Sequence, residues 1–550
     1  MPIPEKETLT IEFKSDMQKI SDSEIFETVV ALANTDGGDI YLGVEDDGRV
    51  TGLHESHMNP VTLSAYISNN TIPPISVRTE VLSEAAPVLK ISVPRCTGGI
   101  AATSSGKILR RRIRIDGTPE SVPMYPPELA TRLSGLRLLD YSAMPVNGAS
   151  TEDFDPLEVE RLRKIVLTYD GDKQLLELQN EELFKALGFA KDIEGRFVPT
   201  ITGLLMIGRV NSIKEHIPTH SATFQVLEGT SVKLNEDRAL PILALFDDFR
   251  AYLEAYNPEK ELESGMYRMS IPDFNKRAIR EGIVNAFAHR DYTKMGRVRV
   301  SITDEGLTIA NPGGFVEGVT INNLLTTEPF GRNPLLADAL KRVGLAEKTG
   351  RGIDRIFEGS LIYGRLLPDY TASTQITVSV FIPRCPIDTH LTKVISDEQK
   401  RLGRPLPLNT LFVLNAIRDV PRSDKNRLAS ITGLSDSVIS IAIQNLSEAG
   451  VIKQKSGTKY ILSREVYPVD LNGSRHLDSN TGSEANYIEE VRRLAFSQEF
   501  ITRSDVMSRL NITESQAYRL LKKLVSEGKL ISLNKGRHSK YRWRLTKLKS

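Results

Sequence analysis

The amino-acid sequence predicts a multidomain protein of the α+β class, and three observations support this. A chain of 550 residues is too long to fold around one hydrophobic core, so three or four domains are expected. Segments with helical spacing of apolar residues alternate with short runs typical of strands and hairpins. The composition, 40% hydrophobic and 26% charged, is that of an ordinary globular protein.

The composition also excludes several classes of protein. The two cysteines, Cys96 and Cys385, lie far apart and support neither a disulfide framework nor a zinc site, which fits a reducing cytoplasm. No stretch approaches the run of about 18 apolar residues that a membrane span needs, and the first residues lack the apolar core of a signal peptide. The net charge of +1 does not by itself indicate nucleic acid. We therefore expect a cytoplasmic protein without a membrane span.

The N-terminal unit, residues 1–140, is predicted to combine helices with β-hairpins. In residues 21–35 a polar cap precedes apolar residues at helical spacing, which predicts a helix. Residues 40–44 are expected to form a strand, and the turn at Asp47-Gly48 starts the return of the chain. A helix that leads into a hairpin indicates a mixed α and β unit.

A later stretch of this unit, RRRIRIDG, is predicted to be a strand with an arginine face. Arg112 and Arg114 alternate with Ile113 and Ile115, so the two arginines lie on one face and the two isoleucines on the other. A row of arginines suits the phosphate backbone of a nucleic acid. The alternative is an exposed edge strand whose charge prevents aggregation.

Two stretches, ETLTIEFKSD and ALANTDGGDIYLGVEDDGRVTGL, closely resemble the Schlafen AlbA-2 domain family. The helix, the Asn-Thr-Asp-Gly-Gly turn and the Gly-Val-x-Asp strand end occur in the same order. The resemblance implies a domain associated with nucleic acid. Animal Schlafens of this type carry an RNase site of two glutamates and one aspartate, and Glu7, Glu12 and Asp46 stand at the matching positions.

The resemblance further implies a catalytic site in which Glu7, Glu12 and Asp46 hold Mg²⁺ or Mn²⁺. Such a metal activates water and stabilises charge on the phosphate. Lys14 is then placed to neutralise charge in the transition state. The alternative is that the acidic residues cap a turn, pair with the arginines of the later strand, or bind no metal.

The central unit, residues 150–390, follows a polar, turn-rich stretch at 140–155 that is predicted to be a linker. Its most informative segment is RAIREGIVNAFAHRDY, a predicted helix with Glu281, Asn285 and His289 at four-residue steps. Such steps place side chains along one face of a helix. A β-hairpin and a Gly-rich loop follow, and then a Gly-Arg-Gly loop leads into another helix. Backbone N–H groups at such a helix start can bind phosphate.

This order of motifs resembles the GHKL (Bergerat-type) ATPase fold, an α/β sandwich, in the variant found in proteins related to the C-terminal part of the RecG helicase. The resemblance implies ATP as a ligand. Glu281 matches the glutamate that polarises the attacking water, and Asn285 matches the asparagine that holds Mg²⁺. A Walker A motif is absent, so a P-loop helicase is not expected.

The remaining implied contacts to the nucleotide come from two loops. Asn311 replaces the family's adenine-contacting aspartate. The implied residues of the base-side loop and of the phosphate lid are Asn311, Gly313, Gly314, Lys348, Gly350, Arg351 and Gly352. The alternative is that Asn285 and His289 only hydrogen-bond neighbouring loops and that the glycines only make turns.

The C-terminal third is predicted to contain two units of similar plan, residues 405–465 and 484–550, joined by a polar linker. Each has short helices followed by a hairpin, an order that resembles winged-helix domains. The second unit is the better candidate for binding nucleic acid because its recognition helix and wing are basic. The candidate contact residues are Gln516, Arg519, Lys522, Lys523, Lys535, Arg537, Lys540 and Arg542. The alternative is a solvated basic tail and a dimer contact, and the first unit is a candidate for dimerisation.

These domains predict a nucleotide-responsive protein that binds DNA or RNA, and in the first instance a homodimeric transcription regulator. The alternative function is a metal-dependent Schlafen-like endonuclease for RNA, tRNA or single-stranded DNA, gated by nucleotide and acting in phage defence. A third interpretation is a scaffold that binds nucleic acid without switching.

Overall fold

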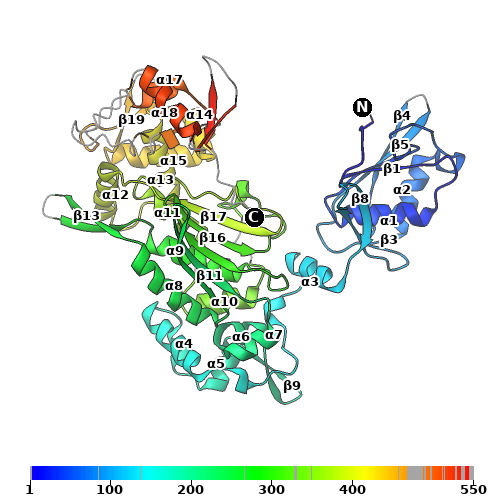
Figure 1. The fold of residues 1–550 in the computed structure, drawn as a ribbon, viewed down its shortest axis with the longest axis horizontal. Helices are drawn as coiled ribbons and strands as arrows, with labels where there is room; N and C mark the ends of the chain where they lie inside the picture. Colours follow the sequence, from blue (N-terminus) through cyan, green and yellow to red (C-terminus); the bar gives the residue numbers. More distant parts are fainter. Residues whose placement is uncertain are drawn as a thin grey trace.

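The computed structural model describes residues 3–467 except 84–85, 137, 265–266, 328–330, 348–349 and 456–457. Beyond residue 467 it describes residues 487, 491–492, 494–495, 498, 500–510, 512, 514–526, 529–533 and 539–543. The blue N-terminal unit stands to one side of the central green sheet, with helix α3 (Pro126–Gly135) between them (Figure 1). The yellow to red C-terminal region lies at the far end of the central unit. The predicted multidomain architecture of helices and sheets is confirmed.

The N-terminal unit is built on a four-stranded sheet in the order β1-β2-β5-β4. Strands β1 and β2 are parallel, because helix α1 forms the crossover between them, and the other pairs are antiparallel. Short strand pairs β3–β6 and β7–β8 complete the unit. The elements are β1 (Ile11–Lys14), α1 (Asp22–Ala33), β2 (Gly38–Leu42), α2 (Pro60–Asn69), β3 (Thr71–Ile72), β4 (Arg78–Ser83), β5 (Pro87–Val93), β6 (Ala102–Thr103), β7 (Leu109–Ile113) and β8 (Pro119–Pro123).

The end of helix α1 is attached to strand β7 by buried hydrogen bonds. The amide group of Asn34 donates to the carbonyl oxygens of Ala101 and Leu109, both at 2.8 Å. The N–H of Ala101 donates back to the Asn34 side-chain oxygen at 2.8 Å. The hydroxyl of Thr35 accepts from the N–H of Arg111 at 2.8 Å. The Asn-Thr-Asp-Gly-Gly turn thus positions the arginine-rich strand.

The central unit contains a five-stranded sheet in the order β12-β11-β15-β16-β17. Strands β11 and β15 are parallel and the other neighbours are antiparallel. The predicted hairpin is formed by β15 and β16. The strands are β11 (Ala222–Glu228), β12 (Ser231–Arg238), β15 (Val298–Ile302), β16 (Gly306–Pro312) and β17 (Thr377–Pro383), with smaller hairpins β9 (Ala190–Ile193)–β10 (Arg196–Pro199) and β13 (Glu259–Ser264)–β14 (Tyr267–Pro272).

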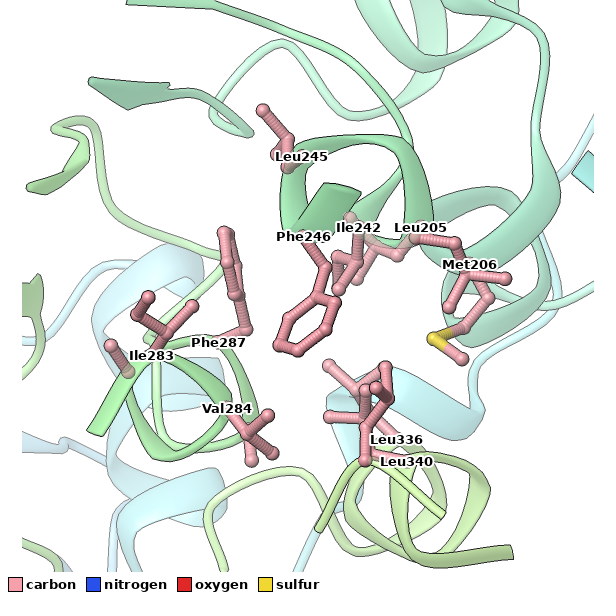
Figure 2. Packing of buried hydrophobic residues seen from close by; sticks show 14 of the residues in the cluster. Leu205, Met206, Ile242, Leu245, Phe246, Ile283, Val284, Phe287, Leu336 and Leu340 are labelled. Carbon is pink, nitrogen blue, oxygen red and sulfur yellow. The ribbon is translucent and has the colours of Figure 1, made fainter. Parts of the chain in front are cut away.

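The helices of the central unit pack around one hydrophobic core. Figure 2 shows Leu205, Phe246, Phe287 and Leu336, from four helices, turned toward one another, and all four are buried. Burying so much apolar surface is the main term that stabilises this unit. The helices are α4 (Pro156–Thr168), α5 (Asn180–Ala186), α6 (Ile201–Ile207), α7 (Val210–His216), α8 (Ile242–Tyr256), α9 (Lys276–Ala288), α10 (Pro334–Arg342) and α11 (Gly352–Leu361).

Residues 140–155, predicted to be a linker, pack against the start of helix α10. The carboxylate of Asp140 accepts from the N–H of Leu335 at 2.9 Å. The hydroxyl of Ser142, which is fully buried, accepts from the N–H of Leu336 at 3.3 Å. These bonds satisfy N–H groups that a helix leaves without partners at its first turn.

The C-terminal region begins with helix α12 in the stretch that separates the central unit from the first predicted winged helix. Buried Leu391 and Ile395 of α12 join the core formed by the following helices. The elements are α12 (Thr389–Leu402), α13 (Leu408–Asp419), α14 (Lys425–Thr432), α15 (Asp436–Glu448), β18 (Ile452–Lys455) and β19 (Lys459–Leu462), then β20 (Ile501–Thr502), α17 (Arg503–Leu510), α18 (Glu514–Ser526), β21 (Leu530–Ser532) and β22 (Lys540–Trp543). Of the helices described, none has both the length and the apolar character needed to cross a membrane.

Candidate functional site

The three acidic residues implied in the N-terminal unit lie near one another at the ends of strands β1 and β2. Glu12 is in β1, and Glu7 precedes that strand and accepts a hydrogen bond from the N–H of Phe13 at 2.9 Å. Asp46 follows β2 and is exposed. Burial raises the pKa of Glu7, and the charges of Glu12 and Asp46 raise it further. The carboxylates are therefore close enough to repel one another.

Both carboxylate oxygens of Glu12 are held by cations. One oxygen lies 3.1 Å from the Lys14 ammonium, and the other lies 2.5 Å from the guanidinium of Arg111. The Arg111 side chain is fully buried and also donates to the carbonyl oxygen of Thr8 at 3.1 Å. Burial alone would lower the pKa of Lys14, but Glu12 and Glu24 outweigh burial and raise it. Glu12 is thus the centre of an ion-paired cluster.

The arginine that contacts Glu12 was not among the residues singled out from the sequence. Leu109 and Arg111 of strand β7 point inward, whereas Ile113 at the end of the strand and Ile115 in the following turn are exposed. A buried arginine needs a carboxylate partner, because an unpaired buried charge is very costly. In the sequence, Arg111 stands two residues after the apolar Leu109, and residues two apart in a strand lie on the same face. This spacing could have indicated that Arg111 points inward.

The two arginines predicted to contact nucleic acid lie on the other face of this strand. The side chains of Arg112 and Arg114 are about half exposed, and both pair with Glu120, at 2.5 and 2.7 Å. Glu120 offsets part of their charge but leaves their outer atoms open to solvent.

The acidic cluster, as arranged, does not fit a bound divalent cation. The oxygens of Glu12 that Mg²⁺ or Mn²⁺ would take are occupied by Lys14 and Arg111. In the part of the chain that the structure describes, no group of three or more His, Cys, Asp or Glu side chains is placed to hold a metal ion. Glu7, Glu12 and Asp46 are thus not arranged as a metal site.

The second candidate site is a cavity of about 430 Å³ in the central unit, bounded by strand β16, helix α9 and the start of helix α11. Most of the residues implied for nucleotide binding line it: Asn285, Asn311, Gly314, Gly350, Arg351 and Gly352. Gly313 lies beside it with φ +99°, a conformation that favours glycine. Lys348 lies outside the described residues.

Helices α9 and α11 approach closely because α11 carries glycine at 359, where an added Cβ atom would lie 2.8 Å from the Cβ of Ala278, and glycine at 352. A Cβ atom added at 352 would lie 2.7 Å from a carboxylate oxygen of Glu281 and 3.4 Å from the amide nitrogen of Asn285. The close approach brings the first N–H groups of α11 to the wall of the cavity. Such groups and the positive end of the helix dipole favour a phosphate.

Glu281 lies beside this cavity but is deeply buried, at 1% exposure. Burial raises its pKa to about 7, and the charge of Glu347 adds to this effect, whereas Arg280 and Arg355 oppose it. Its Oε1 atom has no hydrogen-bond partner. A carboxyl group with such a pKa can accept or release a proton near neutral pH.

His289 and Asn311 supply polar groups elsewhere in the wall. Burial lowers the pKa of His289 to about 4, and Arg332 lowers it further, so the imidazole is neutral at pH 7. Asn311 is buried, and its amide nitrogen donates to the carbonyl oxygen of Pro312 at 3.1 Å. The wall thus offers neutral hydrogen-bonding groups among apolar side chains, as small-molecule sites commonly do.

One loop of the cavity wall forms ion pairs with residues that precede residue 135. Val316 and Val319 line the cavity, and Glu317 between them pairs with Arg95 at 3.6 Å and with Arg132 of helix α3 at 3.3 Å. Glu317 therefore joins the wall of the cavity to two separate segments of the chain before residue 135.

Further contacts near Glu317 join the same parts of the chain. Arg95 also pairs at 3.6 Å with Asp36, in the Asn-Thr-Asp-Gly-Gly turn. Arg332 donates to the carbonyl oxygen of Gly314 at 3.1 Å, and its own carbonyl oxygen accepts from Ser134 of α3 at 3.5 Å. Helix α3 is thus joined to the Gly-rich loop of the cavity through Arg332.

The predicted nucleic-acid contacts of the C-terminal region gather on one helix and one strand. Helix α18 buries Ala517, Leu521 and Leu524. Its exposed face carries Gln516, Arg519, Lys522 and Lys523. Strand β22 contributes Lys540, whose ammonium lies 3.7 Å from the centre of the Phe500 ring, and the exposed Arg542. Lys535 and Arg537 lie outside the described residues.

Comparison with protein-family models gives three matches. Residues 7–117 match the model "Schlafen, AlbA_2". Residues 137–223 match a "Domain of unknown function (DUF8451)", and residues 296–382 match "Putative ATP-dependent DNA helicase recG C-terminal". No curated protein matches the chain.

Among solved structures, the DIP2311 protein from Corynebacterium diphtheriae aligns with a TM-score of 0.51 and 20% sequence identity, over 84% of this chain and 94% of that chain. At this identity the likeness concerns the fold alone. The three family matches end at residue 382, and the two winged-helix units stay a prediction. The chain thus carries a Schlafen/AlbA_2 domain followed by an ATPase-like domain related to the C-terminal part of RecG.

Proposed function

We propose that this protein binds nucleic acid in a nucleotide-responsive manner, most simply as an ATP-binding, DNA-binding transcription regulator that acts as a homodimer. The observation that carries the proposal is the pairing of Glu317 with Arg95 and Arg132. A loop that lines the candidate nucleotide cavity is attached through this pairing to the Schlafen/AlbA_2 side of the molecule. A ligand that moves the loop must therefore act on the N-terminal unit or break these ion pairs.

ATP would occupy the cavity between β16, α9 and α11. The backbone N–H groups from Gly350 to Gly352 and the guanidinium of Arg351 would hold its phosphates, and Asn311 would hydrogen-bond the base. Asn285, on the cavity side of α9, would contact the phosphate end. Bound ATP supplies a transferable phosphoryl group, and Glu281 is the nearby residue able to move a proton near pH 7.

Nucleic acid would be held at two places. In the C-terminal region, α18 would act as the recognition helix of a winged-helix unit and β22 as part of its wing, since basic groups there suit phosphates and groove edges. In the N-terminal unit, the exposed face of β7 with Arg112 and Arg114 would contact a phosphate backbone.

A nuclease is the second candidate function. In its support, the charges of Glu12 and Asp46 raise the pKa of Glu7, which agrees with three neighbouring carboxylates as in the Schlafen RNase pattern. Against cleavage stands the pairing of Glu12 with Lys14 and Arg111. A binding role, in which Lys14 and the arginines of β7 contact phosphate, agrees better with that charge balance.

Substituting Asn285 tests the nucleotide site. We expect Asn285→Ala to weaken binding of a fluorescent ATP analogue by about tenfold or more, since a hydrogen bond to a charged group is worth roughly 1.5–3 kcal/mol. Asn211→Ala, at an exposed position of α7, is the matched control and should bind as the wild type does. Equal affinities for wild type and Asn285→Ala would count against this cavity.

Glu281 should make stability depend on pH. Its pKa rises from 4.5 in the unfolded chain to about 7 in the folded protein, so between these values the folded state binds the extra proton. Its contribution therefore weakens as pH rises from 4.5 through 7, and at pH 8 the ionised group costs up to about 3 kcal/mol. We expect Glu281→Gln to be more stable than wild type in urea at pH 8 but similar at pH 5.

The exposed Glu160 provides the control for this measurement. Glu160→Gln should change stability equally at pH 5 and pH 8. A Glu281→Gln variant that is less stable than wild type at pH 8 would show that the ionised carboxylate is favourable in the fold.

The ion pairs of Glu317 should transmit the state of the cavity. We expect a non-hydrolysable ATP analogue to change the affinity of the full chain for labelled duplex DNA or tRNA by about fivefold or more, the usual scale of coupling between sites. Glu317→Gln should abolish this change while nucleotide binding persists, and exchanging the charges in Glu317→Arg with Arg132→Glu should restore part of it. A full nucleotide effect in Glu317→Gln would refute the link.

The nuclease alternative is tested by incubating tRNA, single-stranded RNA and DNA with Mn²⁺ and the wild type, Glu12→Ala or Asp46→Ala. Because both oxygens of Glu12 are paired with cations, we expect the same background for all three proteins, as judged by gel electrophoresis of end-labelled substrates. Cleavage by the wild type that both substitutions remove would instead establish the nuclease.

A further inference from the structure

We propose that the cleft between helices α8 and α9 is a second ligand site, which takes a small organic anion with an apolar body and a phosphate or carboxylate group. Two cavities, of about 250 and 420 Å³, meet there and share Tyr169, Arg277 and Arg280. This site is independent of the proposed nucleotide site, because it uses a different set of residues of α9.

The two sites lie against different residues of the same helix. The nucleotide cavity is lined by Asn285 of α9 and by His289 directly after this helix, whereas the cleft is lined by Arg277, Arg280, Glu281 and Ile283. Glu347 lines both the nucleotide cavity and the larger cavity of the cleft. The cleft is therefore next to the nucleotide site without being part of it.

One end of the cleft is apolar. Its wall is formed by Phe246, Leu253, Ile279 and Ile283, and the ring of Tyr169 packs edge-on against Phe246 at 5.8 Å between ring centres. An aromatic ring or a short acyl chain would replace water on this surface, which is favourable at about 25 cal/mol per Å². A fully polar ligand would gain nothing there.

The other end of the cleft is lined by three arginines, Arg277, Arg280 and Arg355, and by the carboxylates of Asp170, Glu281 and Glu347. Among the described residues, Arg277 and Arg280 form no ion pair, whereas the neighbouring Arg355 pairs with Glu347 and Glu358, at 3.5 and 2.6 Å. The guanidinium of Arg280 lies over the Tyr169 ring at 5.4 Å. Its Nε atom is buried and has no hydrogen-bond partner.

These features point to an anionic ligand because a guanidinium offers paired donors that match a phosphate or a carboxylate. Arg277 and Arg280 are three residues apart, so both reach the same side of α9. Arg277 and Arg280 have no ion-pair partner among the described residues, and an anion in the cleft would compensate their charge. The cavity volumes suit a small molecule rather than a macromolecule.

A ligand at Arg280 would also act on the neighbouring Glu281. Burial raises the pKa of Glu281, and the positive charge of Arg280 partly opposes that rise. An anion bound to Arg280 would offset this positive charge and favour the protonated carboxyl. Binding in the cleft would in this way change the proton affinity of Glu281, which borders the nucleotide cavity.

Phenyl phosphate is the probe for this site, with inorganic phosphate and phenol as its two halves. By calorimetry on the full chain, we expect phenyl phosphate to bind about tenfold more tightly than either half. Benzoate compared with phenyl phosphate decides between carboxylate and phosphate. The double variant Arg277→Gln/Arg280→Gln should weaken binding by about tenfold or more, because it removes charge-assisted hydrogen bonds.

Three controls keep the test decisive. Arg196→Gln, at an exposed position of hairpin β9–β10, should bind phenyl phosphate as the wild type does, as should Asn285→Ala. If the double variant fails to fold, the single variant Arg277→Gln, at an exposed position, carries the test. Unchanged binding in the arginine variants, loss in Asn285→Ala, or no saturable binding below about 10 mM would overturn the proposal.

Discussion

The central unit depends on the close approach of helix α9 to the first residues of helix α11. Glycine at position 352 leaves room for the carboxylate of Glu281 against the backbone of α11, and glycine at 359 lets α11 approach Asn275 and Ala278 at the start of α9. This approach brings backbone N–H groups to the wall of the cavity. It also removes Glu281 from water, which raises its pKa to about 7. The packing of α9 against α11 thus contributes both to the shape of the cavity and to the proton affinity of Glu281.

In the N-terminal cluster, by contrast, a buried carboxylate is paired with cations. The carboxylate of Glu12 lies against two cations, one of them the fully buried guanidinium of Arg111. Removing Arg111 would leave an uncompensated charge, whereas replacing the whole pair by apolar groups costs less. Such a pair is better explained by a requirement for charge at this place than by stability.

Much of the local structure could be predicted from the sequence, because it depends on neighbours along the chain. The helix that carries Glu281 and Asn285 follows from apolar residues at helical spacing, and the hairpin β15–β16 follows from alternation and a turn. The orientation of Arg111 could not be predicted with the same ease, since alternation defines two faces but not which one is buried. The packing of residues 140–155 on α10 could not be predicted, because a polar stretch rich in turn residues is typical of a linker.

The sequence by itself determined the order of the Schlafen/AlbA_2 and RecG-related domains, their motifs, and a set of expected nucleotide contacts, most of which line the cavity. Tertiary structure alone decided which charges meet. Arg111 lies about a hundred residues from Glu12, and Glu317 more than two hundred from Arg95, yet each pair forms an ion pair. Coulomb energy depends on distance in space and on burial, and neither can be read from separation along the chain.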